Sequence, residues 1–475
     1  MAQKKFYLTT PIFYPNAKLH LGHAYTTTLS DILVRYHRLQ KENVYFLTGS
    51  DENAQTVLAA AKKSGQDTKK FIDDAVESFK QLFSDLNISY DQFIRTSDQI
   101  VHWPGAGKLW QKLAAAGDIY KKEYEGLYCI GHEAFLTEKE LVDGKCPDHG
   151  TVPERLKEEN YFFRLSKYTE EIKKRILLGE LRVVPQSRKN EILSLLEEGL
   201  QDVSFSRPKK AAGVGVPVPG DESQMMYVWC DALTNYITAL GYGRDEKLFT
   251  EFWPADVHVI GKDILRFHAA IWPGMLLSAG LPLPKTLLVH GFITSGGKKM
   301  SKTVGNVIDP QELLTEYGTD ALRYYLARHV SPFEDGDITR EGFKEIYNGD
   351  LANGLGNLAS RIMQLAQTHL PEPVKVEFVP YPKEFAEAFE RFEINRAADY
   401  VWSRIGVLDR KITETEPFKL IKTDPEKGRA LIADLVRELA AIDLLLEPFI
   451  PATSKKIIDS IMTNKKPENL FPRKE

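Results

Sequence analysis

The sequence predicts an α/β protein with a doubly wound parallel sheet, an inserted turn-rich segment and a helical C-terminal region. Two observations predict the sheet. Apolar runs at residues 6–10, 44–48, 257–260 and 286–289 end in proline, glycine or polar residues, and helical patterns follow the first three. Uninterrupted apolar runs are typical of parallel strands that are buried on both faces. A third observation, the helical pattern from about residue 349 onward, predicts a separate bundle.

Composition limits the classes of protein to consider. The 475 residues, 43% hydrophobic and 27% charged, are typical of a globular chain with several domains. The net charge of -4 gives no global basic field, although a local basic patch could still bind nucleic acid. No apolar run is long enough to span a bilayer, and no signal-like segment precedes the first strand. We therefore expect a cytoplasmic protein that does not contact membranes.

The first strand, residues 6–10, should end at Pro11, and a helical pattern runs from Tyr25 to Leu39. The pattern H-L-G-H, His20 to His23, lies where this helix begins. The N–H groups and the dipole at a helix start attract anions, and Gly22 has no Cβ to keep a ligand away. This indicates a phosphate site. The alternative is a polar helix start at which both histidines satisfy loop carbonyls.

The second strand, residues 44–48, leads into Asp51, and helical patterns follow at residues 71–86 and 103–116. In doubly wound sheets, ligands bind beyond the carboxyl ends of the strands. This position favours ligand contact for Asp51, although aspartate is also a good helix N-cap.

The inserted segment between residues 120 and 150 contains two C-x2-H pairs. Cys129 and His132 form the first pair, and Cys146 and His149 form the second. Two such turns can wrap one tetrahedral zinc ion. Four protein ligands leave no open position, so we expect one structural zinc ion. The alternative is two buried cysteines with two incidental surface histidines.

Helical patterns resume at residues 168–178 and 190–199. The G-x-G at residues 213–215 is followed by prolines and cannot open a helix, which excludes a dinucleotide loop. Residues 226–236 should begin extended and become helical, with one apolar face formed by Trp229, Ala232, Leu233 and Tyr236. Such a stripe usually belongs to a core.

Two further strands lead into candidate ligand-binding loops. Residues 257–260 precede Gly261, Asp263 and a helix with His268. Residues 286–289 precede a stretch from Gly296 to Thr303. Its two glycines should act as hinges and its three lysines should attract phosphate, so its composition predicts a mobile loop. A solvated lysine surface is the alternative.

The C-terminal pattern predicts a helix over residues 350–370, a proline-rich linker over 371–382, and helices over 385–413 and 425–447. On the first helix, Asn357 and Arg361 lie four residues apart on a face that differs from the apolar stripe.

Taken together, the motifs resemble those of class I aminoacyl-tRNA synthetases, and most closely the bacterial-type methionyl-tRNA synthetases. The resemblance covers nearly the whole chain: H-L-G-H at residues 20–23, K-M-S-K-T at residues 299–303, the zinc knuckle and the helical end. It implies a Rossmann-like nucleotide-binding catalytic domain that activates methionine with ATP and Mg²⁺ and transfers it to the 3′ end of tRNA(Met).

The resemblance also implies roles for individual residues. His20, His23, Lys299 and Lys302 would stabilise the transition state of adenylate formation. The ATP-binding residues would be His20, Gly22, His23, Gly261, Asp263, Lys299, Met300, Ser301 and Lys302. Asp51 would bind the methionine ammonium, and the pocket would be formed by Ile12, Tyr14, Trp229, Ala232, Leu233, Tyr236, Ile264 and His268. Asn357, Arg361 and Phe418 would bind the anticodon.

The sequence departs from the family pattern at several positions. The knuckle has two histidines where four cysteines are usual, and Asn53-Ala54 stands where His-Gly is usual. Val214 and Phe418 replace tryptophans, and phenylalanine offers less surface for stacking on an anticodon base. The chain ends after the bundle without the family's optional dimerisation module, so we expect a monomer.

The expected domains are a first catalytic half (1–118), a connective insertion (119–224) with its knuckle (127–150), a second catalytic half (225–290), the K-M-S-K-T and stem-contact region (291–348) and the anticodon-binding domain (349–475). Synthetases for leucine, valine or isoleucine usually need an editing insertion, for which residues 120–226 leave little room. A cysteine enzyme would need zinc in its catalytic pocket. A non-catalytic tRNA-binding protein would not need His20, His23, Lys299 and Lys302.

Overall fold

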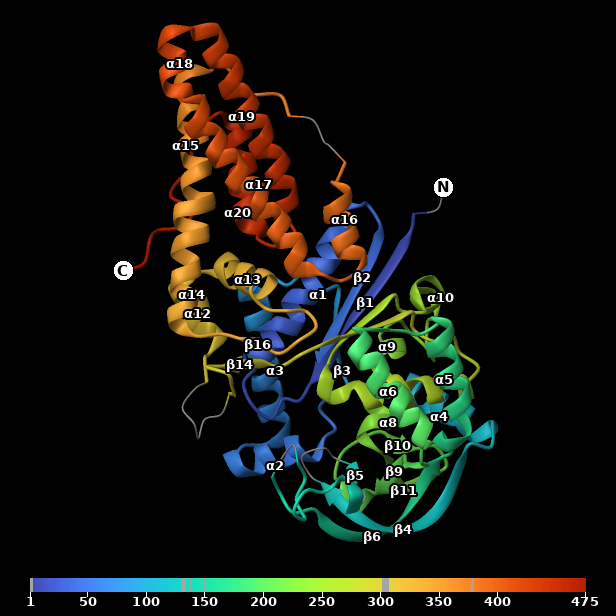
Figure 1. The fold of residues 1–475 in the computed structure, drawn as a ribbon. Helices are drawn as coiled ribbons and strands as arrows, with labels where there is room; N and C mark the ends of the chain where they lie inside the picture. The colour runs from blue at the N-terminus through green and yellow to red at the C-terminus, as the bar shows by residue number, and fades with distance from the viewer. Residues whose placement is uncertain (1–2, 130–133, 137, 148–149, 301–306, 377–379) are drawn as a thin grey trace. The chain divides into compact units, whose positions relative to one another are not determined.

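The computed structural model describes residues 3–129, 134–136, 138–147, 150–300, 307–376 and 380–475. The chain divides into two compact units (Figure 1). Unit 1 comprises Met1–Leu19, Gln40–Leu82 and Ser89–Val289, and unit 2 comprises His20–Leu39, Phe83–Ile88 and His290–Glu475.

The strands of unit 1 are β1 (Lys5–Phe13), β2 (Asn43–Ser50), β3 (Gln92–Arg95), β4 (Ile119–Cys129), β5 (Ala134–Leu136), β6 (Glu154–Phe163), β7 (Arg182–Val184), β8 (Val203–Ser204), β9 (Ser206–Pro208), β10 (Pro217–Val218), β11 (Asp221–Met226), β12 (Val257–Gly261) and β13 (Thr286–His290). Its helices are α2 (Gln55–Ser64), most of α3 (Thr68–Asp85), α4 (Trp103–Ala115), η1 (Glu138–Glu140), η2 (Leu165–Tyr168), α5 (Thr169–Leu178), α6 (Gln186–Glu198), α7 (Lys209–Ala212), α8 (Val228–Leu233), α9 (Asn235–Thr238), α10 (Lys247–Phe252), η3 (Lys262–Ile264), the π-helix η4 (Phe267–Ile271) and α11 (Trp272–Ser278).

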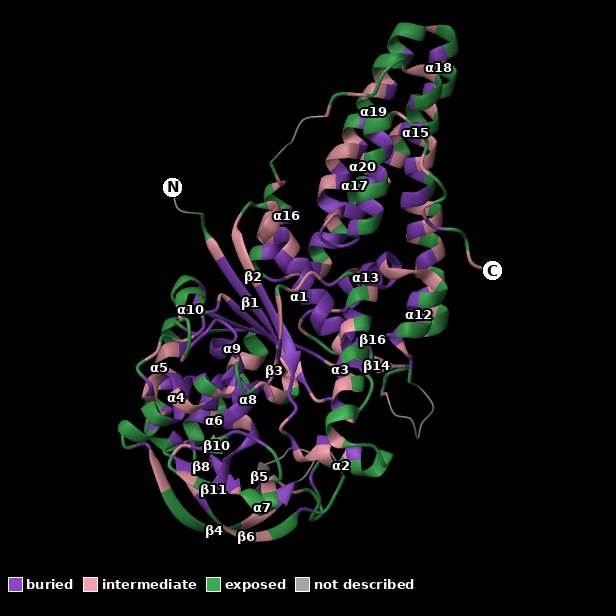
Figure 2. Ribbon diagram, turned by 180° about the vertical axis from the view of Figure 1, so that it is seen from behind, coloured by how far each residue is buried: buried purple, intermediate pink, exposed green. Residues whose placement is uncertain are grey.

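The central sheet of unit 1 has the strand order β3-β2-β1-β12-β13-β7. The pairs β1–β2, β1–β12, β2–β3 and β13–β7 are parallel. This confirms the predicted parallel-sheet core, and β1 is largely buried (Figure 2). The strand order reverses between β1 and β12, and ligands bind in such sheets beyond the carboxyl ends of the strands at that switch point.

The prediction that Pro11 ends the first strand is wrong, because β1 continues to Phe13. The pairing of β1 with β2 shifts register between Thr9 and Ile12. A proline that lacks an N–H donor is tolerated at such an irregularity. The three added residues, 11–13, carry Ile12 alongside Gly49 of β2. A Cβ at Gly49 would lie 2.2 Å from the Ile94 carbonyl oxygen, so only glycine fits there.

Two smaller sheets belong to the inserted part of unit 1. One has the order β5-β4-β6-β8, in which the long strands β4 and β6 pair antiparallel, and the other has the order β10-β11-β9. Residues 213–220 lead through β10 to β11 without opening a helix, which confirms that the G-x-G is not a dinucleotide loop. The predicted change from extended to helical over residues 226–236 is confirmed by β11, α8 and α9.

Unit 2 contains α1 (Leu21–Leu39), β14 (Ile293–Ser295), β15 (Lys298–Lys299), α12 (Pro310–Tyr317), α13 (Thr319–Arg328), β16 (Gly336–Asp337), α14 (Arg340–Ile346), the π-helix η5 (Tyr347–Gly356), α15 (Asn357–His369), α16 (Lys383–Glu390), α17 (Ile394–Thr415), α18 (Pro417–Thr423), α19 (Pro425–Leu446) and α20 (Pro451–Thr463). In the bundle, α19 packs against α15, α17, α18 and α20. The predicted helical C-terminal region is therefore confirmed.

Some predicted helix bounds in the bundle are wrong. The single helix expected over residues 385–413 is broken between α16 and α17, where Phe392 adopts a φ of 60°. Helices α18 and α20 were not predicted. Each begins with a proline at its first position, where the missing N–H costs no hydrogen bond.

A fully buried arginine joins α1 to the rest of unit 2. Arg323 of α13 lies 2.8 Å from the Asp31 carboxylate of α1, and both side chains are inaccessible to solvent. The guanidinium also donates to the carbonyl oxygens of Leu86, Pro448 and Phe449. A buried arginine is tolerated when its charge is paired and its donors are satisfied. Through Arg323, these bonds link α1 and α13 to the turn that precedes α20.

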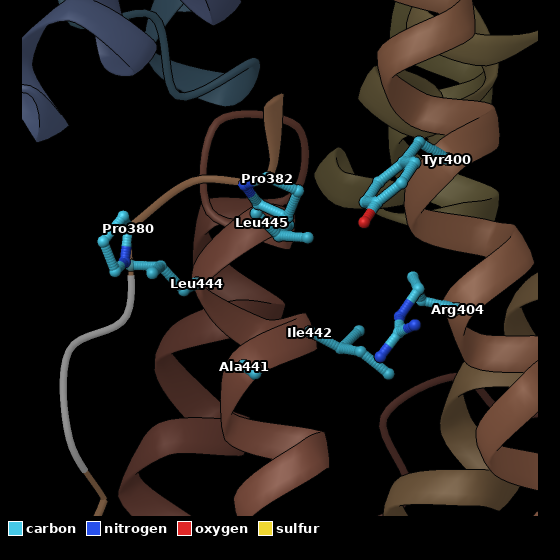
Figure 3. A pocket seen from close by; sticks show the side chains of 8 residues that line it. All are labelled: Pro380, Pro382, Tyr400, Arg404, Ala441, Ile442, Leu444 and Leu445. Atoms are coloured by element: carbon cyan, nitrogen blue, oxygen red, sulfur yellow. The ribbon is translucent and has the colours of Figure 1, made fainter. Parts of the chain in front are cut away.

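The linker before α16 packs on the bundle. Pro380 and Pro382 line a pocket of about 170 Å³ together with Tyr400 and Arg404 of α17 and residues of α19 (Figure 3). Within the described residues, no helix combines the length and the low charge that crossing a bilayer would require.

Candidate functional site

Asp51 of unit 1 follows the last residue of β2 and is 3% exposed. Its backbone N–H donates to the Phe13 carbonyl, which holds it beside the end of β1. The Thr96 hydroxyl donates to the Asp51 carboxylate over 3.4 Å. Ala54, and not Asp51, is the N-cap residue of α2, which excludes the helix-capping interpretation. Asp51 is thus a buried carboxylate at the carboxyl edge of the parallel sheet.

The predicted aromatic stripe lies on α8, α9 and the segment that follows β12. Trp229 is half-buried and stacks on Phe267 of η4, with ring centroids 3.6 Å apart. Leu233 and Tyr236 belong to the main core, against which Ile12 and Ile264 also pack. Tyr14 and Trp229 pack against the same smaller cluster around Tyr227 and Val228. Ala232 and His268 are buried as well.

The hydrogen bonds of His268 fix the direction in which the Tyr236 hydroxyl donates. Nδ1 of His268 lies 3.0 Å from the Ile264 carbonyl, which can only accept, so Nδ1 carries the proton. Burial lowers the pKa of His268 to about 4, so the ring is neutral near pH 7. Its Nε2 therefore accepts from the Tyr236 hydroxyl at 2.7 Å. The two polar groups satisfy each other, and the wall that they form is largely apolar.

Asp51 lies close enough to Tyr236 in this wall for its charge to affect the pKa of the Tyr236 hydroxyl. Burial raises the pKa of Tyr236, and the Asp51 charge raises it further. A carboxylate beside aromatic and aliphatic side chains can bind an ammonium group while the apolar wall accepts an uncharged side chain.

Gly261 and Asp263 lie beyond the carboxyl end of β12, next to the switch point of the sheet. Gly261 ends β12, and Asp263 lies in η3 with an exposed side chain. Ile12 and Tyr14 mark the corresponding end of β1. The topology therefore brings these residues to the one edge of the sheet at which nucleotides bind in such folds.

In unit 2, His20 and His23 lie at the start of α1 with ring centroids 3.9 Å apart, as their spacing predicts. Their Nδ1 atoms accept backbone N–H groups: His20 from Gly22 at 3.0 Å, and His23 from His20 at 3.0 Å. They do not satisfy loop carbonyls through these atoms. Because Nδ1 accepts, each neutral ring carries its proton on Nε2, which is a hydrogen-bond donor.

The space that a Cβ would occupy at Gly22 is taken by the His20 ring and is not open. A Cβ at this position would lie 2.9 Å from Cε1 and 3.1 Å from Nδ1 of His20, so glycine allows the imidazole to fold back over the helix start. Burial lowers the pKa of His23 well below its ordinary value, and His20 and His290 lower it further. His23 is therefore a neutral N–H donor near pH 7.

The predicted loop from Gly296 to Thr303 is a hairpin in its first part. Strands β14 and β15 pair antiparallel, and Gly296 and Gly297 form the turn with φ values of 61° and 71°. Positive φ at both positions is typical of a two-residue hairpin turn, so these glycines serve a turn instead of hinges. Met300 is half-buried, whereas Ser301 and Lys302 lie outside the described residues.

An aspartate on β16 holds this hairpin. The Asp337 carboxylate accepts the Gly297 N–H at 2.8 Å and the Thr294 hydroxyl at 2.8 Å. β16 also pairs in parallel with β14. The backbone that leads to the K-M-S-K-T residues is thereby fixed up to Lys299.

Two of the four predicted zinc ligands can be compared in the structure. Cys129 and Cys146 are buried, at 1% and 0% exposure, and share a small cluster with Leu136. His132 and His149 lie outside the described residues. The two thiols from separate turns are thus brought together, as one metal site requires.

The predicted anticodon residues lie in the helical part of unit 2. Asn357 begins α15 and is exposed. Arg361 is partly exposed, and its Nη1 lies 2.8 Å from the Asp409 carboxylate of α17. Phe418 of α18 is 44% exposed, which is unusual for a large apolar side chain. Val214, the other substituted tryptophan position, is also exposed.

A buried polar cluster in unit 1 has no counterpart among the motifs that the sequence predicts. His102 Nε2 lies 2.6 Å from the Asp231 carboxylate, which also accepts from Asn53 Nδ2 at 2.7 Å. In the sequence, Asn53 differs from its neighbours only as a departure from the family pattern. A lone histidine and a lone aspartate 129 residues apart have no local signal that could have paired them.

Known proteins match this chain over most of its length. The family described as "tRNA synthetases class I (M)" matches residues 6–153 and 148–363. A methionine–tRNA ligase of Clostridium acetobutylicum is 44% identical over 96% of this chain and 73% of its own length. One of Caldanaerobacter subterraneus subsp. tengcongensis is 43% identical over 97% of this chain and 74% of its own length.

Solved structures are similar over the whole fold. A Mycobacterium tuberculosis methionyl-tRNA synthetase in complex with methionyl-adenylate has a TM-score of 0.91 at 35% identity, covering 99% of this chain and 100% of that chain. Its apo form has a TM-score of 0.83 at 33% identity, covering 100% and 99%. The chain therefore belongs to the methionine-specific family of class I tRNA synthetases.

Proposed function

We propose that this chain is a methionine–tRNA ligase. It would join methionine to ATP, giving methionyl-adenylate and pyrophosphate, and then transfer methionine to the 3′-terminal adenosine of tRNA(Met). The similarity to methionine–tRNA ligases over nearly the whole chain carries this proposal. The geometry of unit 1 supports the choice of amino acid.

Methionine would be recognised by charge at one end and by shape at the other. The Asp51 carboxylate would bind its ammonium group. Trp229, Leu233 and the paired Tyr236 and His268 would enclose its side chain, with Ile12, Tyr14, Ala232 and Ile264 completing the pocket. A thioether is apolar and polarizable, so aromatic walls whose polar atoms are already satisfied suit it. An amino acid with a charged side chain would lose its hydration without compensation.

The phosphate chemistry would need no protein nucleophile, because the methionine carboxylate attacks the α-phosphate itself. Gly261 and Asp263 would bind the adenosine, while Gly22, Met300 and Ser301 would help to hold the nucleotide. The Nε2–H groups of His20 and His23 and the ammonium groups of Lys299 and Lys302 would stabilise the negative charge that develops as pyrophosphate leaves. Hydrogen-bond donors that are already in position before the reaction stabilise such developing charge best. Mg²⁺ would accompany the ATP phosphates.

Amino-acid-dependent exchange of labelled pyrophosphate into ATP tests the proposal. We expect exchange with methionine and little with leucine, isoleucine, valine or cysteine. Exchange that is driven by another amino acid would reassign the substrate. A complete lack of exchange, with tRNA binding retained, would indicate a non-catalytic tRNA-binding protein.

We also propose one structural zinc ion, held by Cys129, Cys146, His132 and His149. Thiolates and imidazoles are the usual ligands of structural zinc, and the two buried thiols share one small cluster. Among the described residues, Cys129, Leu136 and Cys146 form the buried part of that cluster, so these residues supply little apolar stabilisation of their own. The ion would fold the knuckle and would take no part in the chemistry.

Replacing Cys129 with serine should remove the zinc and loosen the knuckle. Elemental analysis of protein purified without added metal should find about one zinc ion per chain in the wild type and much less in Cys129→Ser. Cys230→Ser is the matched control, because Cys230 is also buried but belongs to the main core. A wild type that is folded and active without any metal would remove the site from this proposal.

We propose that Asn357, Arg361 and Phe418 bind the anticodon of tRNA(Met). Asn357 is exposed, Arg361 is partly exposed, and the exposed Phe418 ring could stack on a base. Asp409 would orient the Arg361 guanidinium through their 2.8 Å contact.

We expect Arg361→Ala to weaken aminoacylation while sparing pyrophosphate exchange, which needs no tRNA. A lost base contact costs about 1–3 kcal/mol, so kcat/KM for tRNA should fall about 5- to 150-fold. Arg437→Ala, which removes another Arg–Asp pair on the bundle surface, is the control. An equal loss in both assays would mean that Arg361 supports the fold instead.

The monomeric state and the cytoplasmic location stay predictions. Analytical ultracentrifugation of the purified chain tests the first, and cell fractionation tests the second.

A further inference from the structure

A buried polar cluster in unit 1 links segments that are far apart in the sequence. We name it the Asp231 cluster; it comprises Asn53, His102, Asp231 and Thr238. His102, Asp231 and Thr238 are inaccessible to solvent, and Asn53 is half-buried. Such a cluster is costly to bury unless every member is satisfied.

The hydrogen bonds of the cluster satisfy its carboxylate at both oxygens. Oδ1 of Asp231 accepts from His102 Nε2 at 2.6 Å, and Oδ2 accepts from Asn53 Nδ2 at 2.7 Å. On the other side of the imidazole, His102 Nδ1 lies 2.8 Å from the Thr238 hydroxyl. Asn53 Nδ2 also donates to the Thr96 carbonyl at 3.1 Å. The amide of Asn53 thus bridges the Asp231 carboxylate and the strand-end segment after β3.

The position of each partner indicates what the cluster does. Asn53 follows Asp51 by two residues, and the hydroxyl of Thr96 contacts the Asp51 carboxylate. Asp231 lies on α8 between Trp229 and Leu233, and His102 precedes α4. The cluster therefore ties the segment that bears Asp51 to the helix that bears the aromatic wall. The Asn53–Asp231 hydrogen bond is a direct side-chain link between these two segments.

We infer that Asp231 is a positioning residue for methionine: through Asn53 it sets the distance from the Asp51 carboxylate to the wall of α8. This inference rests on the proposed function. A fixed distance of this kind matters because the ammonium and the side chain of one small amino acid must be bound at the same time. Asn53 stands where the resembled family usually has histidine, and its amide supplies the donor that the carboxylate needs.

Asp231→Asn tests the inference with little change in size. An amide at residue 231 has one acceptor oxygen, so it can accept from His102 or from Asn53 but not from both. Its NH₂ group would face the N–H donor of the remaining partner. We expect KM for methionine in pyrophosphate exchange to rise about tenfold or more, while kcat and KM for ATP stay within about twofold of the wild type. Quenching of tryptophan fluorescence on titration with methionine should show a matching loss of affinity.

Two further variants keep the test decisive. Asn53→Ala should raise KM for methionine in the same way, and Asn53→His, which keeps a donor, should restore most of the affinity. If the Asp231→Asn protein does not fold, Asn53→Ala still tests the hydrogen bond between Asn53 and Asp231, because Asn53 is only half-buried. Asp118→Asn is the matched control, because Asp118 is also buried in unit 1 but pairs with Lys167, Tyr168 and Ser278. It should lower the melting temperature without a change in KM for methionine.

Some outcomes would overturn the inference. A methionine KM that changes no more in Asp231→Asn and Asn53→Ala than in Asp118→Asn would reduce the cluster to a stabilising role. A parallel change in the KM for methionine, the KM for ATP and the melting temperature would do the same. Failure of the proposed function would look different, because the wild type itself would then show no methionine-dependent exchange.

Discussion

Asp51→Asn should lower kcat/KM for methionine more than any other substitution in unit 1. Asp51 is 3% exposed, so an ammonium bound to it is desolvated and strongly attracted. The amide has nearly the same shape but no charge, and its NH₂ group would face the ammonium. Loss of one partner of a buried charged pair costs about 2–5 kcal/mol, so kcat/KM should fall about 30-fold at the least.

Steady-state pyrophosphate exchange at varied methionine and ATP concentrations measures this effect. The loss should lie mainly in KM for methionine, with KM for ATP close to that of the wild type. Asp118→Asn again serves as the control for removal of a buried carboxylate. An Asp51→Asn enzyme with unchanged methionine KM would show that the ammonium binds elsewhere, and the pocket assignment in unit 1 would be wrong.

The parts of this site that the sequence predicts are those formed by contiguous residues. The strand, loop and helix over residues 6–39 follow from apolar runs and a helical period, and the structure has β1 and α1 there. The rings of His20 and His23 lie together because residues three apart share a helix face. Their proton positions could not be predicted, because these depend on which backbone N–H groups the Nδ1 atoms accept.

Other features depend on contacts across the sequence. His102 and Asp231 have ordinary neighbours, and only the packing of α4 against the segment around α9 brings them within 2.6 Å. Similarly, the role of Asp337 becomes clear only when β16 lies beside β14. Composition alone predicts hinges at Gly296 and Gly297, because it does not distinguish a hinge from a tight turn. The positive φ of both residues makes that distinction.

Helix periods also mislead where the backbone departs from 3.6 residues per turn. The segments Phe267–Ile271 and Tyr347–Gly356 are π-helical, which shifts the faces of the following residues. The break at Phe392 is hidden because the apolar pattern continues through it from α16 into α17. These departures do not change which residues are apolar. The sequence therefore predicts the bundle but not where each of its helices begins and ends.

Lys302→Gln should produce the largest loss of rate, and it should do so without a loss of methionine affinity. Lys302 lies outside the described residues, and the expectation rests on its place in the K-M-S-K-T motif and on its charge. An ammonium that approaches the triphosphate as charge develops is worth more in the transition state than in the ground state. Removal of one such donor typically costs about 100- to 1000-fold in rate.

Single-turnover measurements of methionyl-adenylate formation separate rate from affinity for this variant. The rate at saturating substrates should fall by the full factor, whereas the methionine dissociation constant should stay within about twofold of the wild type, because Asp51 and the aromatic wall belong to unit 1. Lys298→Gln is the matched control: Lys298 is an exposed lysine of β15 in the same run. A similar loss in both variants would indicate a general effect of positive charge near the site. A methionine affinity that fell together with the rate would instead make the K-M-S-K-T segment a wall of the amino acid pocket.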